Sequence, residues 1–260
     1  MIHALTWMPA ALRDAGLKVA PVDGWESRGV AAMGNVAGVM CHHTAGPRHS
    51  NMPSLDTLVG GRPDLRGPLA QIGLGRDGTC YIVAAGRCNH AGDGNWQGVT
   101  WGNSRFIAVE AENTGAADDW PWPVVQIDAY QRCVAALLRH LQRPAGWCCA
   151  HREYALPQGR KPDPVFDMPA FRAAVAAILD GSAAPVELIP TAEASGAGRP
   201  TLRRNDHDPL VGLLQQRLGL AQDQHFGPHT EAAVRVFQRT RLLVPDGIVG
   251  PKTWGQLDQP

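Results

Sequence analysis

The sequence predicts an α/β protein with a mixed central β-sheet flanked by helices, followed by a small C-terminal domain of three helices. Short apolar runs rich in β-branched residues alternate with amphipathic segments through the first 180 residues. A stretch rich in Gly, Ala, Ser and Pro follows, and helical spacing of apolar residues resumes beyond it. We therefore expect a domain at 1–180 with an N-terminal extension, a linker at 181–203 and a domain at 204–260.

Five segments of the first domain read as strands. An Asp-Gly pair at Asp77-Gly78, between two strand-like runs, predicts a hairpin. The 106–112 run alternates, so Glu110 and Glu112 should share one face. The five expected strands cover 36–41, 70–75, 79–84, 106–112 and 147–150.

Helices and loops account for the rest of the chain. The clearest helical pattern covers 127–143 and stops at Pro144. The other helices of the first domain are expected at 10–17, 52–60 and 169–179, and loops at 62–67 and 86–104. In the C-terminal part, three helices follow Asp208-Pro209 and two Gly-Pro-x-Thr turns, at Gly227 and at Gly250, which form a small internal repeat.

Charge and hydropathy exclude several classes of function. The chain of 260 residues has 24 Lys and Arg against 24 Asp and Glu, so its net charge gives no signal for nucleic acid or for an anionic membrane. No apolar run approaches the roughly 20 residues that a membrane span needs. The first residues lack the basic start, apolar block and cleavage site of a secretory signal, so we expect synthesis in the cytoplasm.

The six cysteines do not have the density of a disulfide framework. Their apolar surroundings favour buried thiols that behave as small hydrophobic side chains. A disulfide between Cys80 and Cys88, across the expected hairpin, is the less favoured alternative.

The segment 150–164 contains the most informative chemistry. His151 precedes Asp163 by twelve residues, and both side chains are good zinc ligands. A catalytic zinc usually takes three protein ligands and leaves one position for water. His42, at the end of the first buried strand, is the best source of the third. We therefore hypothesise a zinc hydrolase with the ligands His42, His151 and Asp163, although any lone histidine is more often structural.

Two further residues fit this hypothesis. Glu110 would face the site if its strand neighbours that of His42, and a carboxylate there can take the proton of an attacking water. Lys161 can stabilise the oxyanion formed when an amide carbonyl is attacked. The alternatives are an exposed strand carboxylate for Glu110 and a surface ion pair for Lys161.

The first domain also resembles a known family. The motifs CHHTAG, RDGT, NHAG, IAVEAENTG and AHREY…GRKPDP occur in the order seen in type-2 N-acetylmuramoyl-L-alanine amidases, which share a superfamily with peptidoglycan recognition proteins. The resemblance implies one Zn²⁺ ion on His42 (rather than His43), His151 and Asp163, with Glu110 and Lys161 as catalytic residues. It also implies that His90, His43 and Thr44 contact substrate. A tyrosine that several members carry before the Asp-Gly hairpin is replaced here by Ala70.

The C-terminal domain resembles a three-helix peptidoglycan-binding module, with Asp223-Gln224-His225 in place of the usual Asp-Gly pair. Together the two domains resemble endolysins of phages that infect actinobacteria. This implies a monomer that accumulates in the host cytoplasm, is released by a holin and degrades peptidoglycan.

Three functional alternatives follow from the resemblance. The first is an enzyme that cleaves the amide between N-acetylmuramic acid and L-alanine. The second is a recognition protein that binds peptidoglycan without cutting it, and the retained Asp163 argues against it. The third is a bacterial amidase that remodels the wall or recycles its fragments.

Overall fold

The protein is described from a computed structural model, which covers residues 5–48, 50–183 and 199–258. These residues divide into two compact units, of which the smaller contains the three C-terminal helices. Most of the expected linker, residues 184–198, lies outside the described residues.

The larger unit is built on a six-stranded mixed sheet with the order β1-β6-β5-β7-β2-β8. Only the pair β5–β6, which forms the predicted Asp-Gly hairpin, is antiparallel; the other neighbours are parallel. All six residues of β2 are buried, as expected for a parallel strand that is covered on both faces. The strands are β1 Val19–Pro21, β2 Gly38–His43, β5 Ile72–Leu74, β6 Cys80–Ile82, β7 Phe106–Ala111 and β8 Cys148–Ala150.

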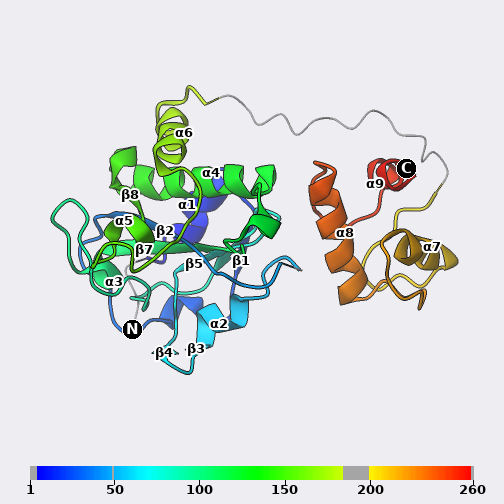
Figure 1. The fold of residues 1–260 in the computed structure, drawn as a ribbon, viewed down its shortest axis with the longest axis horizontal. Coiled ribbons are helices and arrows are strands. Elements are labelled where there is room, and N and C mark those ends of the chain that lie inside the picture. Colours follow the sequence, from blue (N-terminus) through cyan, green and yellow to red (C-terminus); the bar gives the residue numbers. More distant parts are fainter. Residues whose placement is uncertain (1–4, 49, 184–198, 259–260) are drawn as a thin grey trace. The chain divides into compact units, whose positions relative to one another are not determined.

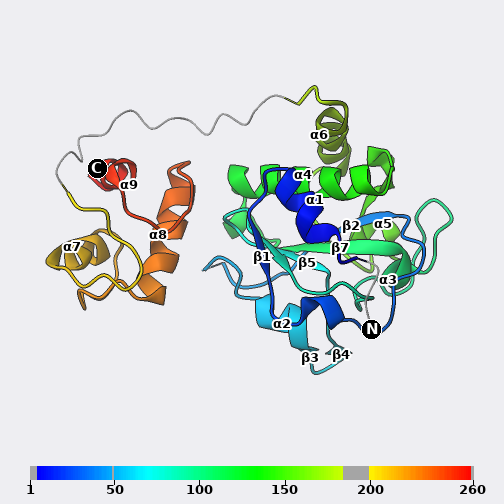
Figure 2. The same cartoon turned by 180° about the vertical axis from the view of Figure 1, so that it is seen from behind.

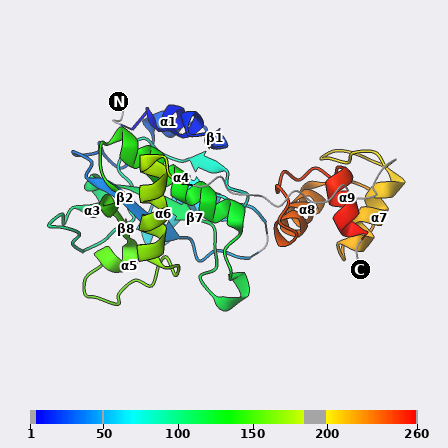
Figure 3. The same cartoon turned by 90° about the horizontal axis from the view of Figure 1, so that it is seen from above.

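Three helices cover one face of this sheet (Figures 1 and 2). They are α1 (Met8–Asp14), α4 (Val124–His140) and α6 (Met168–Asp180). Seen from above, α1 lies near β1 and α6 near β8, so the helices follow the width of the sheet (Figure 3). Alternate strand residues, such as Val39 and Cys41, pack against them. Many aliphatic side chains are fully buried in this layer. Because each of them contributes about 1.5–3 kcal/mol to the stability of the fold, this layer is the main hydrophobic core.

The opposite face carries smaller elements: α2 (Leu55–Gly60), α3 (Gly102–Arg105), α5 (His151–Tyr154) and a two-stranded sheet of β3 (Gly61–Arg62) and β4 (Leu65–Arg66). The prediction of a loop at 62–67 was therefore wrong. A tight antiparallel turn forms because Gly61 adopts a φ of 90° and lies against Gly67. A Cβ on Gly61 would lie only 2.2 Å from the Gly67 nitrogen.

The cysteines behave as expected for buried thiols. All six are buried and free. Cys80 packs in the core beneath α4, whereas Cys88 belongs to the cluster on the other face of the sheet. The alternative of a disulfide between them was wrong, because the strand that carries Cys80 separates the two side chains.

The smaller unit contains α7 (Pro209–Arg217), α8 (Pro228–Thr240) and α9 (Pro251–Leu257). Each helix begins with a proline in its first turn, where the missing N–H is not needed. Their apolar faces meet around Phe226 and the fully buried Trp254. Across the described parts of the chain, we find no helix with the length and apolar character required to cross a membrane.

Candidate functional site

The parallel strands β2, β7 and β8 bring the predicted site residues to one edge of the sheet. Parallel strands end at the same edge, which is where open α/β sheets usually place their chemistry. His42 lies directly opposite Glu110 in the β2–β7 register. Cys41 lies opposite Ala150 in the β2–β8 register, so His151, the next residue, emerges beside His42.

Alternation along β2 separates the two adjacent histidines. Side chains of successive strand residues point to opposite faces. His43 shares the face of Val39 and Cys41, under α4, where its ring lies 6.4 Å from that of Trp122. His42 points to the other face, as does Glu110. Alternation along β2 therefore explains why His42, and not His43, lies beside His151 and Asp163.

His42, His151 and Asp163 form the one group of three metal-ligating side chains found among the described residues. His42 Nδ1, His151 Nδ1 and Asp163 Oδ2 form a triangle in which each side measures 3.1 Å. Ligand atoms held tetrahedrally at about 2.0–2.1 Å from a zinc ion lie about 3.3 Å apart. Two imidazole nitrogens and a carboxylate oxygen also form a typical ligand set for catalytic zinc, so the residues fit the ion.

The other ring nitrogens of the two histidines are also engaged. His151 Nε2 lies 3.0 Å from the carbonyl oxygen of Ala91, to which it can only donate, leaving the Nδ1 lone pair free for a metal. His42 Nε2 lies 3.1 Å from Nδ1 of His90. The Tyr130 hydroxyl accepts a hydrogen bond from the His42 amide at 2.9 Å and contacts the Val109 carbonyl at 2.7 Å. The two Nε2 contacts thus orient the imidazole rings, and Tyr130 holds the backbone at His42.

The surroundings of His42 and Asp163 keep these two side chains in the protonation states that a metal requires. Burial, reinforced by the charge of His151, lowers the pKa of His42 to about 4, although the hydrogen bond with Asp163 opposes this. Burial alone would raise the pKa of Asp163, but the close contacts of its carboxylate with His151 and His42 lower it well below its usual range. At neutral pH, His42 is therefore neutral and Asp163 is ionised.

Glu110 borders the cluster without belonging to it. Its Oε1 lies 3.8 Å from His42 Nδ1, and its Oε2 is buried with no hydrogen-bond partner among the described residues. Burial raises the pKa of this carboxyl, as do the charges of Asp163 and Glu112, whereas Lys161 lowers it. A buried carboxylate oxygen without a donor carries a desolvation penalty that structures rarely retain without a functional reason.

Lys161 lies close enough to affect the same groups. Its positive charge lowers the pKa of both His42 and Glu110. The backbone of this loop is held in place because the Arg152 amide donates to the Asp163 carbonyl at 2.8 Å. Lys161 and Asp163 are therefore carried by the same anchored segment.

The three predicted substrate contacts lie in different surroundings. His90 is buried and contacts His42. His43 lies on the other face of β2 and packs against Gly115, where an added Cβ would lie only 2.3 Å from His43 Nε2. The Thr44 hydroxyl donates to Glu112 Oε1 at 2.7 Å. Substrate binding by these residues stays a prediction.

Glu112 follows the end of β7 and was expected to share the face of Glu110. Its carboxylate is fully buried and accepts hydrogen bonds from Thr44 and from both the amide and the hydroxyl of Ser54. Glu112 therefore ties the segment after β2 to the start of α2. This is a structural role, in contrast to the unpaired oxygen of Glu110.

Arg76 was not recognised from the sequence as a residue of the site. It is buried in the β5–β6 turn, where its guanidinium donates to the carbonyls of Glu112 at 3.1 Å and Pro47 at 3.0 Å. It also pairs with Asp119 at 2.5 Å. Arg76 thus holds together the loops that follow β2 and β7. The one signal in the sequence was the arginine next to the Asp-Gly pair, but that pair predicts only a hairpin and not the partners of Arg76.

Tyr81, on β6, lies on the same face of the sheet as Glu110. It is in register with Gly73 on β5, and Gly73 is in register with Glu110 on β7. Residues in register on neighbouring strands project from the same face of a sheet.

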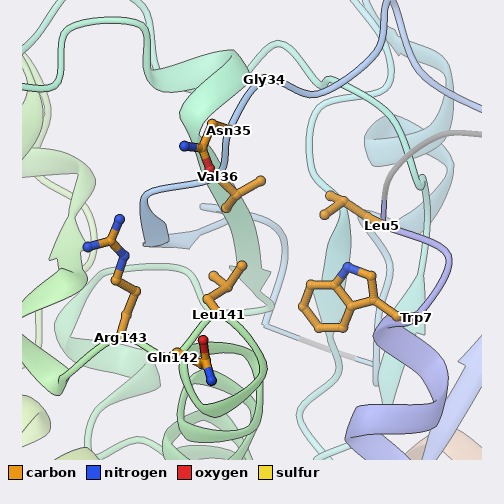
Figure 4. A pocket seen from close by; sticks show the side chains of 8 residues that line it. All are labelled: Leu5, Trp7, Gly34, Asn35, Val36, Leu141, Gln142 and Arg143. Atoms are coloured by element: carbon orange, nitrogen blue, oxygen red, sulfur yellow. The ribbon is translucent and has the colours of Figure 1, made fainter.

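A cavity of about 480 Å³ lies elsewhere, lined by Leu5, Trp7, Gly34, Asn35, Val36, Leu141, Gln142 and Arg143 (Figure 4). Its residues precede β2 and follow α4, whereas the metal-ligating cluster lies at the far end of β2. Six strand residues span about 20 Å, so this cavity is not part of the site.

Comparison with known families gives two matches. Residues 32–166 match the family model described as N-acetylmuramoyl-L-alanine amidase. Residues 207–257 match the model for a peptidoglycan binding domain. A curated protein of Kitasatospora aureofaciens, described as an uncharacterized protein in the bpoA1 3' region, is 46% identical over 66 residues, which cover 23% of this chain and 56% of that protein. The chain thus spans little more than half the length of this relative.

Three of the solved structures that the chain matches are amidases or hydrolases. The amidase AmiD from E. coli, in complex with its substrate, is 20% identical, with 89% of this chain and 90% of that chain covered and a TM-score of 0.42. The hydrolase AmiA of Staphylococcus aureus is 15% identical, with 71% and 97% covered and a TM-score of 0.47. The endolysin LysCS from Clostridium intestinale is 15% identical, with 60% and 93% covered and a TM-score of 0.46.

Proposed function

Because the chain belongs to the N-acetylmuramoyl-L-alanine amidase family, we propose that it hydrolyses the amide between N-acetylmuramic acid and L-alanine in bacterial peptidoglycan with the help of one zinc ion. The observation that carries this proposal is the triangle of His42 Nδ1, His151 Nδ1 and Asp163 Oδ2. These three atoms would hold the ion. Zinc supplies Lewis acidity, which polarises a carbonyl and lowers the pKa of water toward neutrality.

The remaining residues have roles that follow from their positions. Glu110 takes the proton of the attacking water, since its unpartnered oxygen and raised pKa make it an effective base at this edge of the sheet. Lys161 stabilises the negative charge that develops on the carbonyl oxygen during attack. The proton held by Glu110 can then pass to the leaving amine of L-alanine, which completes the hydrolysis.

The smaller unit suits retention on the wall. Its match to a peptidoglycan binding domain supports a two-domain enzyme with a catalytic part at 1–180, a linker at 181–203 and a wall-binding part at 204–260. This arrangement resembles that of phage endolysins, and we propose that the protein is a monomeric lysin of this kind. Synthesis in the host cytoplasm and release by a holin belong to the same proposal.

The test uses purified actinobacterial peptidoglycan and the full chain. We expect new free amino groups of L-alanine to appear with no new reducing sugars. A chelator should stop the release, and added zinc should restore it. Reducing sugars in place of free amino groups, or cleavage that persists after complete zinc removal, would refute the mechanism.

A binding protein without catalytic activity is the second candidate. It predicts retention on peptidoglycan by the full chain without any release of amino groups at high enzyme concentration. The complete set of three ligand atoms and the adjacent Glu110 favour the enzyme, because a protein that only binds has no need for either.

A further inference from the structure

Trp101 is the most exposed large hydrophobic side chain among the described residues, with 76% of its surface accessible. Tryptophan usually buries most of its large apolar surface, so such exposure needs an explanation. In a soluble protein, an exposed aromatic ring on a well-ordered backbone commonly marks a binding surface. The question is therefore whether the backbone at Trp101 is held in place.

The Tyr154 hydroxyl fixes the backbone on both sides of Trp101. It donates to the carbonyl of Thr100 at 2.6 Å and accepts from the amide of Gly102 at 2.9 Å. Gly102 permits this approach, because a Cβ there would lie 2.4 Å from the Ala91 Cβ and 2.9 Å from the Tyr154 oxygen. The indole thus projects into solvent from a segment that a buried tyrosine clamps.

The clamp connects the segment around Trp101 to elements that carry the metal-ligating cluster. Tyr154 belongs to α5, the single helical turn that begins with His151. On the other side, the Asn103 side chain accepts hydrogen bonds from the amides of His90 and Ala91, both at 2.8 Å. His90 contacts His42, and the Ala91 carbonyl contacts His151. Two short paths of hydrogen bonds therefore connect the backbone that carries Trp101 to His42 and to the helical turn that begins with His151.

We propose that Trp101 is a stacking surface for a sugar ring of the glycan strand, next to the muramoyl residue whose amide is cleaved. This inference rests on the proposed function and names the part of the substrate that the residue recognises. The C–H groups on one face of a pyranose ring pack well against the negative face of an indole. A rigid, exposed indole contributes such a contact with little loss of conformational freedom on binding. Tyr154 is a positioning residue that acts through Trp101.

The test compares two substrates with the full-length, zinc-loaded protein. One is a soluble glycan strand that carries peptide stems, and the other is a muramoyl peptide with a single sugar. For Trp101→Leu, which keeps an apolar side chain but removes the flat ring, KM for the strand should rise about three- to tenfold with kcat unchanged. KM for the single-sugar substrate should stay the same.

Two further variants probe the geometry. Trp101→Phe keeps an aromatic face and should recover most of the affinity for the strand. Tyr154→Phe keeps the ring that packs 5.9 Å from Phe106 but loses the clamp, so it should raise KM for the strand about two- to threefold. Melting temperatures of the Trp101 variants should match the parent, because an exposed ring contributes little to the core.

The matched control is Trp120→Leu, which removes the other strongly exposed tryptophan, 56% accessible. It should change KM for the strand less than twofold. Equal losses for the two tryptophans would mean that any exposed indole promotes adsorption, and would overturn the assignment. Equal losses of Trp101→Leu on both substrates, or no loss on either, would also overturn it. Failure of the parent protein to cleave either substrate would instead refute the proposed function.

Discussion

The larger and the smaller unit both bury polar side chains, but the two units differ in whether these side chains have hydrogen-bond partners. In the smaller unit, Gln215 Nε2 contacts Asp223, the His225 carbonyl and Thr230, while its Oε1 accepts from the Gln224 amide. Gln238 makes the same four contacts 23 residues later, to Asp246, Ile248, Thr253 and Gly247. Each buried glutamine amide is thus fully satisfied within its own unit.

The larger unit instead buries a triangle of ligand atoms and a carboxylate oxygen, that of Glu110, for which the described part of the chain offers no donor. Such an arrangement is incomplete by itself, because each of its atoms would gain from a cation or a water at the centre. The difference distinguishes polar groups that support the fold from polar groups that await a ligand. Substitutions of the two buried glutamines should therefore change stability, whereas substitutions of the ligand atoms and of Glu110 should change chemistry.

The largest expected effect comes from Asp163→Ala. Loss of one ligand atom should lower amidase activity at least about 10³-fold and abolish stoichiometric zinc binding, measured by amino-group release and by metal analysis. Binding to peptidoglycan through the smaller unit should persist. The control is Asp167→Ala, which removes the N-cap contact to Ala170 but no ligand. Activity of Asp163→Ala above a tenth of the parent would contradict the ligand assignment.

Glu110→Gln should have the next largest effect, a drop in kcat of about 10²- to 10⁴-fold with zinc retained. Its melting temperature should not fall, since the change removes a buried carboxyl whose ionised form is disfavoured. Glu112→Gln should behave in the opposite way, with a clear loss of thermal stability because three hydrogen bonds depend on the carboxylate. If both variants lose stability equally, the distinction drawn between the two carboxylates is wrong.

In the smaller unit, Gln238→Leu should lower the local free energy of unfolding by about 2 kcal/mol, because the Gly247 amide and the acceptors of the turn lose their partner. Hydrogen exchange of the amides in 202–257, followed by mass spectrometry on the full chain, measures this. Gln215→Leu should produce a loss of similar size. Amidase activity on a single-sugar substrate should not change in either variant.

The smallest expected effect is a gain. Gln224 has a φ of 60° at the position where the second turn has Gly247 with a φ of 76°. A non-glycine residue in this region costs about 1–2 kcal/mol, partly offset by the greater backbone entropy of glycine. Gln224→Gly should therefore stabilise the smaller unit by about 0.5–1 kcal/mol in the same exchange experiment, whereas Gly247→Ala should destabilise it. A loss of stability in Gln224→Gly would show that its side chain contributes more than the strain removes.

Much of the fold could be predicted because local patterns agree with tertiary structure. Buried runs identified the strands before His42 and His151, and the Asp-Gly pair identified the hairpin. Alternation alone placed Glu110 on the face of His42 once the two strands were assumed to be neighbours. The fold class, a mixed sheet with a three-helix unit, is confirmed by the strand order.

Features that depend on distant segments could not be predicted. The partners of Arg76 lie 29 and 43 residues away, at Pro47 and Asp119, and no local pattern records them. The same holds for the clamp between Tyr154 and the backbone around Trp101, since its two parts lie more than 50 residues apart. The turn of β3 and β4 was missed because it depends on the approach of Gly61 to Gly67 rather than on side-chain periodicity.

The repeated glutamine network has a consequence for how the smaller unit can diverge during evolution. Each glutamine reaches an aspartate eight residues later and a threonine fifteen residues later. The contacts require these two separations. Exposed residues between the glutamine and the threonine can therefore be substituted, but the number of residues between them is fixed. Insertions and deletions should therefore be selected against between Gln215 and Thr230 and between Gln238 and Thr253.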